Sequence, residues 1–337
     1  MNILMTTEFF YPHIGGLESI TESLADEFVN MGHSVIVITN TIEKGNKVFP
    51  YIILRNPSIK ELWKAYIWCD IFVHQQLSLK RIWPLFLKRK PWIVTYHQVG
   101  WQSGILGIIK YLISKLSTYN VCVSQTTANG YRLKNYEIIY NAYNDTAFKK
   151  TCSNERKNIA FVGRLIKGKG LFLLIEAFNK FKEKTGSDYK LSIIGEGKDK
   201  NEIISFASQT KFANDIHFLG ALNPYEVSQV LNKHHILAVT STHPYYEAFG
   251  IVVLEGLACG CIVVGADGDG IEEALHGVGI LYKNGDEQDL CNAIIKAYNL
   301  SQDAEIANNA LVAEWLNSRT KRKVAEEYIK VFEKYIC

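Results

Sequence analysis

Two apolar runs, joined by a loop and a helix-like segment, constrain the fold of this 337-residue chain most strongly. Residues 235–241 and 261–266 are both mostly apolar, which is typical of strands buried on both faces. The segment between them contains a short helical stretch that begins near Ile251 and is closed by Gly260. A strand, a helix and a second strand in this order predict a βαβ unit, and therefore a parallel sheet.

The same alternation runs through the whole chain. In the first part, a helix is expected over 17–31, and strands are expected at 3–7, 34–39, 71–74, 92–96 and 120–124. A polar turn cluster at 140–145 marks the crossing point, after which come a strand at 159–163, a helix over 170–182 and a strand at 190–195. A last helix follows from Thr320. The pattern predicts an α/β protein with two Rossmann-like domains, 1–150 and 151–316.

Composition indicates an ordinary globular protein, with 47% hydrophobic and 21% charged residues. The seven cysteines form no C-x-x-C pair and no disulfide-like spacing, so a reduced, cytoplasmic protein is expected. The first residues read as a strand and not as a signal peptide, and no apolar run approaches the roughly 20 residues of a spanning helix.

Charge is distributed unevenly. Residues 1–150 carry 16 basic and 10 acidic side chains, a net charge of +6, whereas the remainder carries a net charge of −3. A basic first half favours anionic partners such as phospholipids or pyrophosphate-bearing lipids. Nucleic acid is not expected as a partner, because no nucleic-acid-binding motif occurs.

Two glutamates stand eight positions apart around a glycine, in the segment E-A-F-G-I-V-V-L-E at 247–255. Glu247 falls in the loop after a strand, and Glu255 falls among apolar residues of the following helix. A carboxylate in such surroundings is costly to bury without hydrogen-bond partners. Helix N-termini at the carboxyl ends of parallel strands bind phosphate, so this segment is predicted to be a ligand site.

Three further clusters stand where a strand ends. Gly15 and Gly16 precede a helix and let the backbone approach a ligand closely. Arg164 and Lys169 lie five positions apart in a glycine-containing loop, which suits a diphosphate. His97 follows an apolar strand, where a histidine can either form a structural hydrogen bond or contact a ligand.

These motifs together resemble those of retaining glycosyltransferases with the GT-B fold, in detail family 4 (glycosyl transferases group 1). The resemblance rests on the E-x7-E spacing, the G-R-L-x-x-x-K-G loop at 163–170 and the segment G-L-A-C-G-C-I-V-V-G-A-D-G-D-G-I-E-E-A-L that follows Glu255. It covers nearly the whole chain. It implies two Rossmann-like domains facing a central cleft, with the C-terminal helix, 320–337, packed back on the first domain.

The resemblance also implies a reaction, namely transfer of a hexosyl group from a nucleoside-diphosphate sugar to an acceptor hydroxyl with retention of configuration. Glu247 and His97 would face the transferred sugar, and Glu255 would hold the ribose. The remaining donor-binding residues would surround the diphosphate: Gly15, Gly16, Arg164, Lys169, Phe249, Gly250 and Ile251. No metal and no cofactor are expected, because the positive loop takes the place of a metal ion. Asp267-Gly-Asp269 resembles a metal-binding pair but follows the wrong strand for that role.

The chain departs from the family pattern at several positions. Gln98 follows His97 where the family often has aspartate, which leaves the orientation of the imidazole open. Asp269 and Glu272 stand where Gly and Pro are common. Gly195-Glu-Gly197 lacks the third glycine of a dinucleotide fingerprint and is expected to be a turn beside the donor site.

The acceptor is expected to be a lipid-linked cell-envelope glycan, with the protein held peripherally at the inner face of an anionic membrane. Cations and aromatic residues alternate over 79–92, and an apolar segment follows at 101–113. The five cations are Lys80, Arg81, Lys88, Arg89 and Lys90. The alternative is that residues 105–113 form a core helix and that Trp83 and Trp92 are packed inside.

Two other functions use the same architecture. A hydrolysing sugar-nucleotide epimerase needs no separate acceptor, but is not expected to combine the E-x7-E motif with the Arg/Lys loop. A non-catalytic nucleotide-sugar-binding protein would have no need of the complete set of charged residues. Turnover of a donor in the presence of an acceptor distinguishes these cases.

Overall fold

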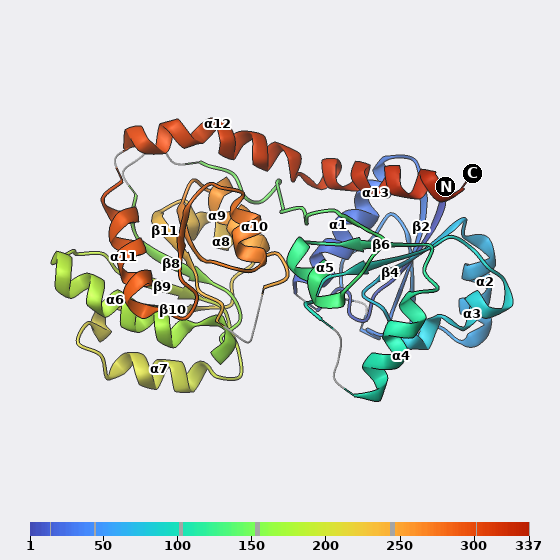
Figure 1. The fold of residues 1–337 in the computed structure, drawn as a ribbon, viewed down its shortest axis with the longest axis horizontal. Helices are drawn as coiled ribbons and strands as arrows, with labels where there is room; N and C mark the ends of the chain where they lie inside the picture. Colours follow the sequence, from blue (N-terminus) through green and yellow to red (C-terminus); the bar gives the residue numbers. More distant parts are fainter. Residues whose placement is uncertain are drawn as a thin grey trace. The chain divides into compact units, whose positions relative to one another are not determined.

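The computed structural model describes residues 1–13, 15–43, 45–100, 104–151, 156–242, 247–300 and 302–336. They form two compact units (Figure 1). Unit 1 comprises residues 1–142 together with 321–337, and unit 2 comprises residues 143–320.

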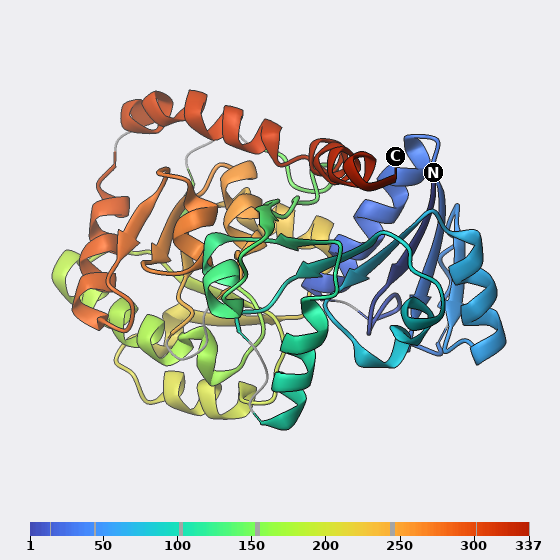
Figure 2. The ribbon, with the colours of Figure 1, turned by 45° about the vertical axis from the view of Figure 1, so that its right-hand side comes forward.

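Unit 1 contains a seven-stranded parallel sheet, whose strands lie side by side in Figure 2 in the order β3-β2-β1-β4-β5-β6-β7. The strands are β1 (Asn2–Thr6), β2 (Ser34–Thr39), β3 (Ile52–Arg55), β4 (Ile71–Gln75), β5 (Trp92–Tyr96), β6 (Tyr119–Cys122) and β7 (Tyr136–Ile138). The helices are α1 (Gly16–Asn30), α2 (Ile59–Trp68), α3 (Trp83–Leu87), α4 (Ile105–Ser114), α5 (Gln125–Tyr131) and α13 (Lys321–Ile336), with a 3-10 turn at Leu79–Arg81. Every residue of β4 and β5 is buried, as expected for central strands covered on both faces.

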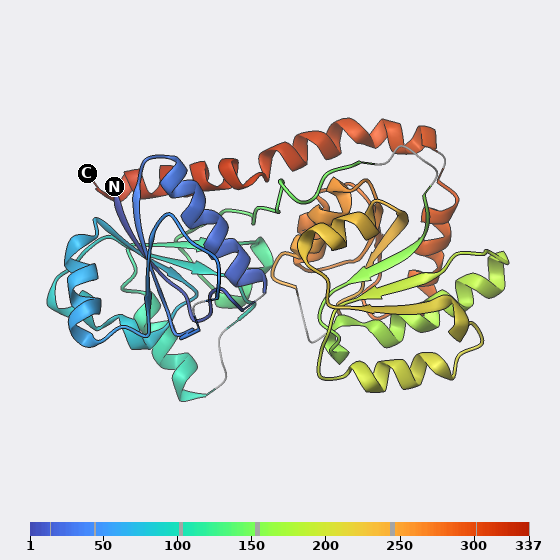
Figure 3. The same cartoon turned by 180° about the vertical axis from the view of Figure 1, so that it is seen from behind.

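Unit 2 contains a six-stranded parallel sheet in the order β10-β9-β8-β11-β12-β13. Its strands are β8 (Lys157–Val162), β9 (Leu191–Ile194), β10 (Ile216–Gly220), β11 (His234–Val239), β12 (Ile262–Ala266) and β13 (Ile280–Tyr282). Its helices are α6 (Leu171–Thr185), α7 (Lys200–Ser208), α8 (Pro224–Leu231), α9 (Ile251–Ala258), α10 (Gly270–Leu275), α11 (Glu287–Tyr298) and α12 (Gln302–Ser318). Figure 3 shows α6 and α7 on one face of this sheet, with α8, α9 and α10 on the other. The 3-10 turns are Lys167–Lys169 and Ala213–Asp215.

The boundaries between the units differ from the expected residues 150 and 316. The segment after residue 142 belongs to unit 2, because its backbone is bonded there. The Tyr143 N–H donates to the Arg319 carbonyl at 3.2 Å, and the Asn232 side chain bonds both Lys149 and Thr151 at 2.9 and 2.7 Å. A polar turn at 140–145 is visible in the sequence, whereas these long-range bonds are not.

The C-terminal helix α13 packs against α1 within unit 1. The ring of Phe28 in α1 meets the rings of Phe332 and Tyr328, with centroids 5.6 and 6.5 Å apart. These three side chains are fully or almost fully buried. Residues from the two ends of the chain therefore share one hydrophobic core.

Two residues of the expected membrane-facing segment, Arg81 and Trp92, are buried, so their predicted surface positions are wrong. Arg81 is buried, and its guanidinium donates to the carbonyls of Thr7 and Ile38 at 3.0 and 3.1 Å and to the Asn40 side chain. It therefore joins the ends of β1 and β2 and is not a surface cation. Trp92 is also buried, whereas α4 is not a core helix. Residues 101–103 of the expected apolar segment lie outside the described residues.

Candidate functional site

The predicted residues of unit 2 gather at the carboxyl ends of the adjacent strands β8 and β11. From β8 the chain winds towards β9 and β10, whereas from β11 it winds towards β12 and β13. The order of the strands therefore reverses between β8 and β11. Parallel α/β sheets bind ligands outside the carboxyl ends of the strands at such a switch point.

The loop that carries Arg164 and Lys169 is fixed to the end of β11. Thr240 donates its hydroxyl to the Lys169 carbonyl at 2.9 Å, and the Thr242 N–H donates to the Gly168 carbonyl at 3.0 Å. Gly170 has a φ of +69°, and a Cβ there would overlap the Thr240 carbonyl. Only glycine fits at this position, so the close contact between the two loops depends on it.

Lys169 and Glu247 form an ion pair between their Nζ and Oε1 atoms. Each side chain is 22% exposed, and the Ser241 hydroxyl also donates to Glu247 Oε1 at 2.9 Å. Burial, and then the nearby charge of Arg164, lower the pKa of Lys169 to about 8, and the nearby Asp269 carboxylate partly opposes this lowering. A cation and a carboxylate from two strand ends thus meet at the switch point.

Asp269 anchors the backbone of Glu247. Its carboxylate accepts a hydrogen bond from the Glu247 N–H at 3.0 Å and from the Ile271 N–H at 2.8 Å, which makes it the N-cap of α10. Its side chain is 2% exposed, and burial raises its pKa to about 7. In the sequence, Asp269 stands out as a departure from the family pattern and as part of a pair that resembles a metal site, and its capping role is not predicted. Its position directly before a helical stretch is the signal that could have indicated it.

Arg164 is exposed beside Lys169, and no carboxylate in the described part of the chain pairs with its guanidinium. The loop behind it is held by the turn after β9. The Leu165 N–H donates to the Glu196 carbonyl at 2.9 Å, and a Cβ on Gly197 would overlap the Leu165 backbone. The 195–197 turn thus packs against the backbone of the Arg164 loop. The guanidinium itself is exposed and is available to an anion.

Glu255 lies in the second turn of α9 and is partly buried. Among the described residues none donates a hydrogen bond to its carboxyl group, and burial raises its pKa to about 7. At the start of α9, Gly250 has a φ of +76°, and the Phe249 side chain is buried in the core. The first N–H groups of a helix have no intrahelical acceptor, so those near Gly250 and Ile251 can bind an anion.

The remaining predicted residues lie in unit 1, after the carboxyl ends of β1 and β5. Gly15 has an extended backbone (φ −171°), and a Cβ on Gly16 would meet no atom within 4 Å. Neither glycine is required by the local backbone, and Gly16 leaves open space at the N-terminus of α1. This openness is compatible with close approach of a ligand.

His97 follows β5 and is oriented by two glutamines at the end of β4. Its Nε2 lies 2.7 Å from Gln75 Oε1, and its backbone N–H donates to Gln76 Oε1 at 3.0 Å. Burial lowers its pKa to about 3, so the ring is neutral near pH 7. When Nε2 carries the ring proton, it donates a hydrogen bond to Gln75 Oε1. The buried Nδ1 is then an acceptor, and it has no hydrogen-bond partner among the described residues. Gln98 is exposed and does not orient the ring.

The arrangement within unit 2 suits a polyanion that carries a reacting group. Arg164, Lys169 and the N-terminus of α9 offer positive charge and N–H donors, while Glu247 and Glu255 offer carboxyl groups. Within the described ranges, no group of three or more His, Cys, Asp or Glu side chains could hold a metal ion. None of the helices described is long and apolar enough to cross a bilayer.

The chain is similar to known glycosyltransferases in sequence and in fold. Residues 144–313 match the sequence family described as "Glycosyl transferases group 1". The chain is 26% identical to a human protein named as a subunit of phosphatidylinositol N-acetylglucosaminyltransferase, over 99% of the chain and 76% of that protein. It is 25% identical to an uncharacterized glycosyltransferase of Methanocaldococcus jannaschii, over 85% of the chain and 86% of that protein.

Two solved structures have the same fold. Anabaena HepE in complex with UDP gives a TM-score of 0.82 at 18% identity, over 99% of this chain and 100% of that one. WaaG, a glycosyltransferase involved in lipopolysaccharide biosynthesis, gives a TM-score of 0.71 at 16% identity, over 98% and 99% of the two chains. The predicted fold class, GT-B with two Rossmann-like domains, is therefore confirmed.

Proposed function

The chain belongs to the group 1 glycosyl transferases, and on that premise we propose that it is a family 4 enzyme that moves a hexosyl group from a nucleoside-diphosphate sugar to an acceptor hydroxyl. The observation that carries this proposal is the contact of Lys169 with Glu247 beside the exposed Arg164 at the switch point of unit 2. HepE has been crystallised with UDP and glucose, which supports a nucleotide sugar as the donor.

The leaving diphosphate gains negative charge as the bond between sugar and phosphate breaks. Arg164, Lys169 and the N–H groups around Phe249, Gly250 and Ile251 stabilise this charge. When the donor binds, the Lys169 ammonium exchanges Glu247 for a phosphate oxygen. No metal ion and no cofactor take part in this proposal.

Glu247 then faces the hydroxyl groups of the sugar and lies near the positive charge that develops at the anomeric carbon. Glu255 accepts hydrogen bonds from the ribose. The buried Nδ1 of His97 accepts a hydrogen bond from a sugar hydroxyl. The backbone of Gly15 and Gly16 is approached by the donor phosphate and the acceptor, for which Gly16 leaves open space.

The reaction proceeds with retention of configuration. The acceptor oxygen attacks the anomeric carbon on the face that the diphosphate leaves, and a phosphate oxygen takes the acceptor's proton. One glycosidic bond forms and one sugar–phosphate bond breaks, so the products are the glycosylated acceptor and a nucleoside diphosphate.

The acceptor in this proposal is a lipid-linked glycan of the cell envelope, and the protein works in the cytoplasm at the inner face of the membrane. Two relatives support a lipid-linked acceptor by their names. One is the human phosphatidylinositol N-acetylglucosaminyltransferase protein, and the other is a Campylobacter jejuni transferase named for a diphospho-undecaprenol acceptor, 35% identical over 40% of this chain.

Substitution of the site residues tests the proposal. Glu247→Gln is expected to lower kcat strongly with little change in nucleotide affinity, because its contact is to the reacting sugar. Arg164→Ala and Lys169→Ala are expected to weaken binding of the nucleoside diphosphate by about 1.5–3 kcal/mol, the usual effect of losing a charge-assisted contact. Calorimetric titration with UDP and GDP measures this directly.

Four results would contradict the proposal. Unchanged diphosphate affinity in Arg164→Ala would remove the diphosphate site, and loss of activity in a chelator would remove the metal-free mechanism. Release of a free, epimerised sugar without any acceptor would instead identify a hydrolysing epimerase. A nucleotide sugar that binds but never turns over would identify a binding protein.

A further inference from the structure

A long segment of unit 1 contains no carboxylate. Between Asp70 and Glu137 the chain has no aspartate and no glutamate, but it has nine lysines and arginines. The segment forms β4, α3, β5, α4, β6 and α5. Any surface that this segment forms by itself is therefore cationic.

Helix α4 presents its apolar side chains to solvent. Ile105, Ile108 and Leu112 are 77%, 61% and 55% exposed, whereas the buried residues of the helix are Gly107 and Ser114. A helix on the surface of a globular domain normally has the opposite arrangement. Continuous exposed apolar surface of this kind marks a binding surface.

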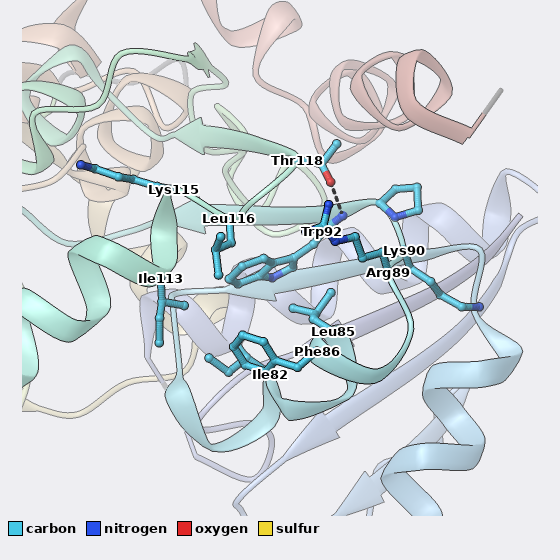
Figure 4. Close-up of a pocket in the computed structure, with 11 residues that line it drawn as sticks. Ile82, Leu85, Phe86, Arg89, Lys90, Trp92, Ile113, Lys115, Leu116 and Thr118 are labelled. Carbon is cyan, nitrogen blue, oxygen red and sulfur yellow. Dashed lines mark hydrogen bonds between the residues drawn. The ribbon is translucent and has the colours of Figure 1, made fainter.

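A pocket of about 640 Å³ adjoins the end of α4. It lies between α3, the residues after α4 and the first residues of β5, so it is at the amino ends of the strands, away from His97. Figure 4 shows its apolar side chains converging on the indole of Trp92. The apolar lining consists of Ile82, Leu85, Phe86, Pro91, Trp92, Ile113 and Leu116.

The wall formed by Trp92 is held in place by two hydrogen bonds. Its indole N–H donates to His74 Nδ1 at 2.7 Å, and its backbone N–H donates to the Thr118 hydroxyl at 3.0 Å. This wall of the pocket is therefore held rigidly at the amino end of β5 and is not formed by a loose side chain.

Cations stand beside this apolar surface. Lys88 and Arg89 are exposed after α3, and Arg89 and Lys115 line the pocket. Lys115 lies over the ring of Tyr111, with its Nζ 4.5 Å from the centroid. Lys90 has a different role, because its ammonium bonds the carbonyls of Ile67 and Cys69 at the end of α2.

We propose that α4 and the adjoining pocket, together called the α4 surface, dock unit 1 on a bilayer that contains anionic phospholipid. The apolar side chains of α4 enter the boundary between headgroups and acyl chains, and the pocket takes part of one phospholipid, with Arg89 and Lys115 on its phosphate. An anionic bilayer buries the exposed apolar side chains and attracts the neighbouring cations. This inference rests on the proposed function, since it names the surface that brings the enzyme to a lipid-linked acceptor.

Co-sedimentation with vesicles tests the α4 surface in the full-length protein. Binding is expected with phosphatidylcholine vesicles that contain phosphatidylglycerol, and not with pure phosphatidylcholine. Ile108→Glu and Leu112→Glu are expected to abolish it. Arg89→Gln and Lys115→Gln are each expected to lower the partition coefficient about fivefold, as for one basic residue at such a surface. Leu311→Glu is the matched control, because Leu311 is a 58% exposed leucine on α12 of unit 2.

Three outcomes would overturn the inference. They are equal binding to both kinds of vesicle, anionic-vesicle binding that survives Ile108→Glu, and self-association of the wild-type chain that Ile108→Glu abolishes without any vesicle. Because the substituted α4 residues are exposed, unfolding is not expected, and thermal unfolding of each variant verifies this.

A second measurement examines the pocket itself. Soluble short-chain phosphatidylglycerol is expected to bind with micromolar to millimolar affinity. In Leu116→Glu this affinity is expected to fall at least tenfold. Inorganic phosphate is expected not to compete with the lipid. Full competition by inorganic phosphate would show an anion site without lipid specificity and would overturn the pocket assignment. Nucleotide-sugar binding without vesicles is measured separately, so that failure of the proposed function and failure of the α4 surface give different results.

Discussion

At the scale of single residues, Asp269 has the most specific local role. It is buried, and its two carboxylate oxygens bind the N–H groups of Glu247 and Ile271, so it links the loop after β11 to the start of α10. We therefore regard it as a positioning residue for Glu247.

Asp269→Asn tests this role. One of the two acceptor oxygens is replaced by an amide group, so either the Glu247 or the Ile271 N–H loses its partner, at an expected cost of about 1–3 kcal/mol in the free energy of unfolding. We expect kcat to fall while the affinity for nucleoside diphosphate stays within about twofold. Urea unfolding and steady-state kinetics measure the two effects. An equal loss of diphosphate affinity would show that the whole donor site had collapsed.

The pH dependence of stability follows from Glu255 and Asp269. Burial raises the pKa of both carboxyl groups to about 7, well above their unfolded values near 4. The folded state therefore holds these protons more tightly, and the stability they contribute is lost as pH rises through about 7. We expect the Tm to fall between about pH 5 and pH 8, and to fall less in Glu255→Gln. Glu314→Gln, an exposed position on α12, is the control and should follow the wild type.

At the scale of elements, the two glycine-containing loops differ in why they need glycine. Gly170 has a positive φ and touches the Thr240 carbonyl, whereas Gly16 has neither constraint. In the first loop, the close contact of Gly170 with Thr240 fixes the position of Lys169. The second leaves space at a helix N-terminus, which matters only if a ligand enters it.

This difference predicts opposite effects of alanine. Gly170→Ala should destabilise the protein by more than about 1 kcal/mol, because the backbone conformation and the contact are both incompatible with a Cβ. Gly16→Ala should leave stability unchanged or slightly higher but raise KM for the donor. Thermal unfolding and kinetics are measured in parallel. Loss of stability in Gly16→Ala, or normal activity with it, would argue against the ligand space.

At the scale of the whole molecule, unit 1 is completed by the last residues of the chain. Phe332 of α13 is fully buried against Phe28 of α1. The contact joins elements separated by almost the full length of the sequence. Unit 1 is therefore expected to depend on α13 for its stability.

Phe332→Ala should lower the free energy of unfolding by about 3–5 kcal/mol, as for other large aromatic residues truncated in a core. Lys330→Ala, at an exposed position of the same helix, is the control. Urea unfolding followed by circular dichroism measures both. Equal stability of the two variants would mean that α13 does not contribute to the core of unit 1.

Local sequence patterns predict nine of the thirteen strands described, and the loops in which the candidate residues lie. Apolar runs of strand length and helical periodicity are local signals, and loops after parallel strands lie at one edge of a sheet whatever the rest of the chain does. The strands at 52–55, 136–138, 216–220 and 280–282 are not predicted from the sequence. Three of them have only three or four residues, and the fourth, I-H-F-L-G at 216–220, is interrupted by a histidine, so none forms an apolar run of clear strand length.

The contacts, orientation and burial of the candidate residues depend on the tertiary structure. The pairing of Lys169 with Glu247, the hydrogen bond from the Glu247 N–H to Asp269 and the orientation of His97 by Gln75 all join residues that are far apart in the sequence. Burial of Arg81 and exposure of α4 likewise depend on which elements pack together. Sequence patterns report the preferences of neighbouring residues, whereas burial and charge pairing are set by contacts that form only when distant segments meet.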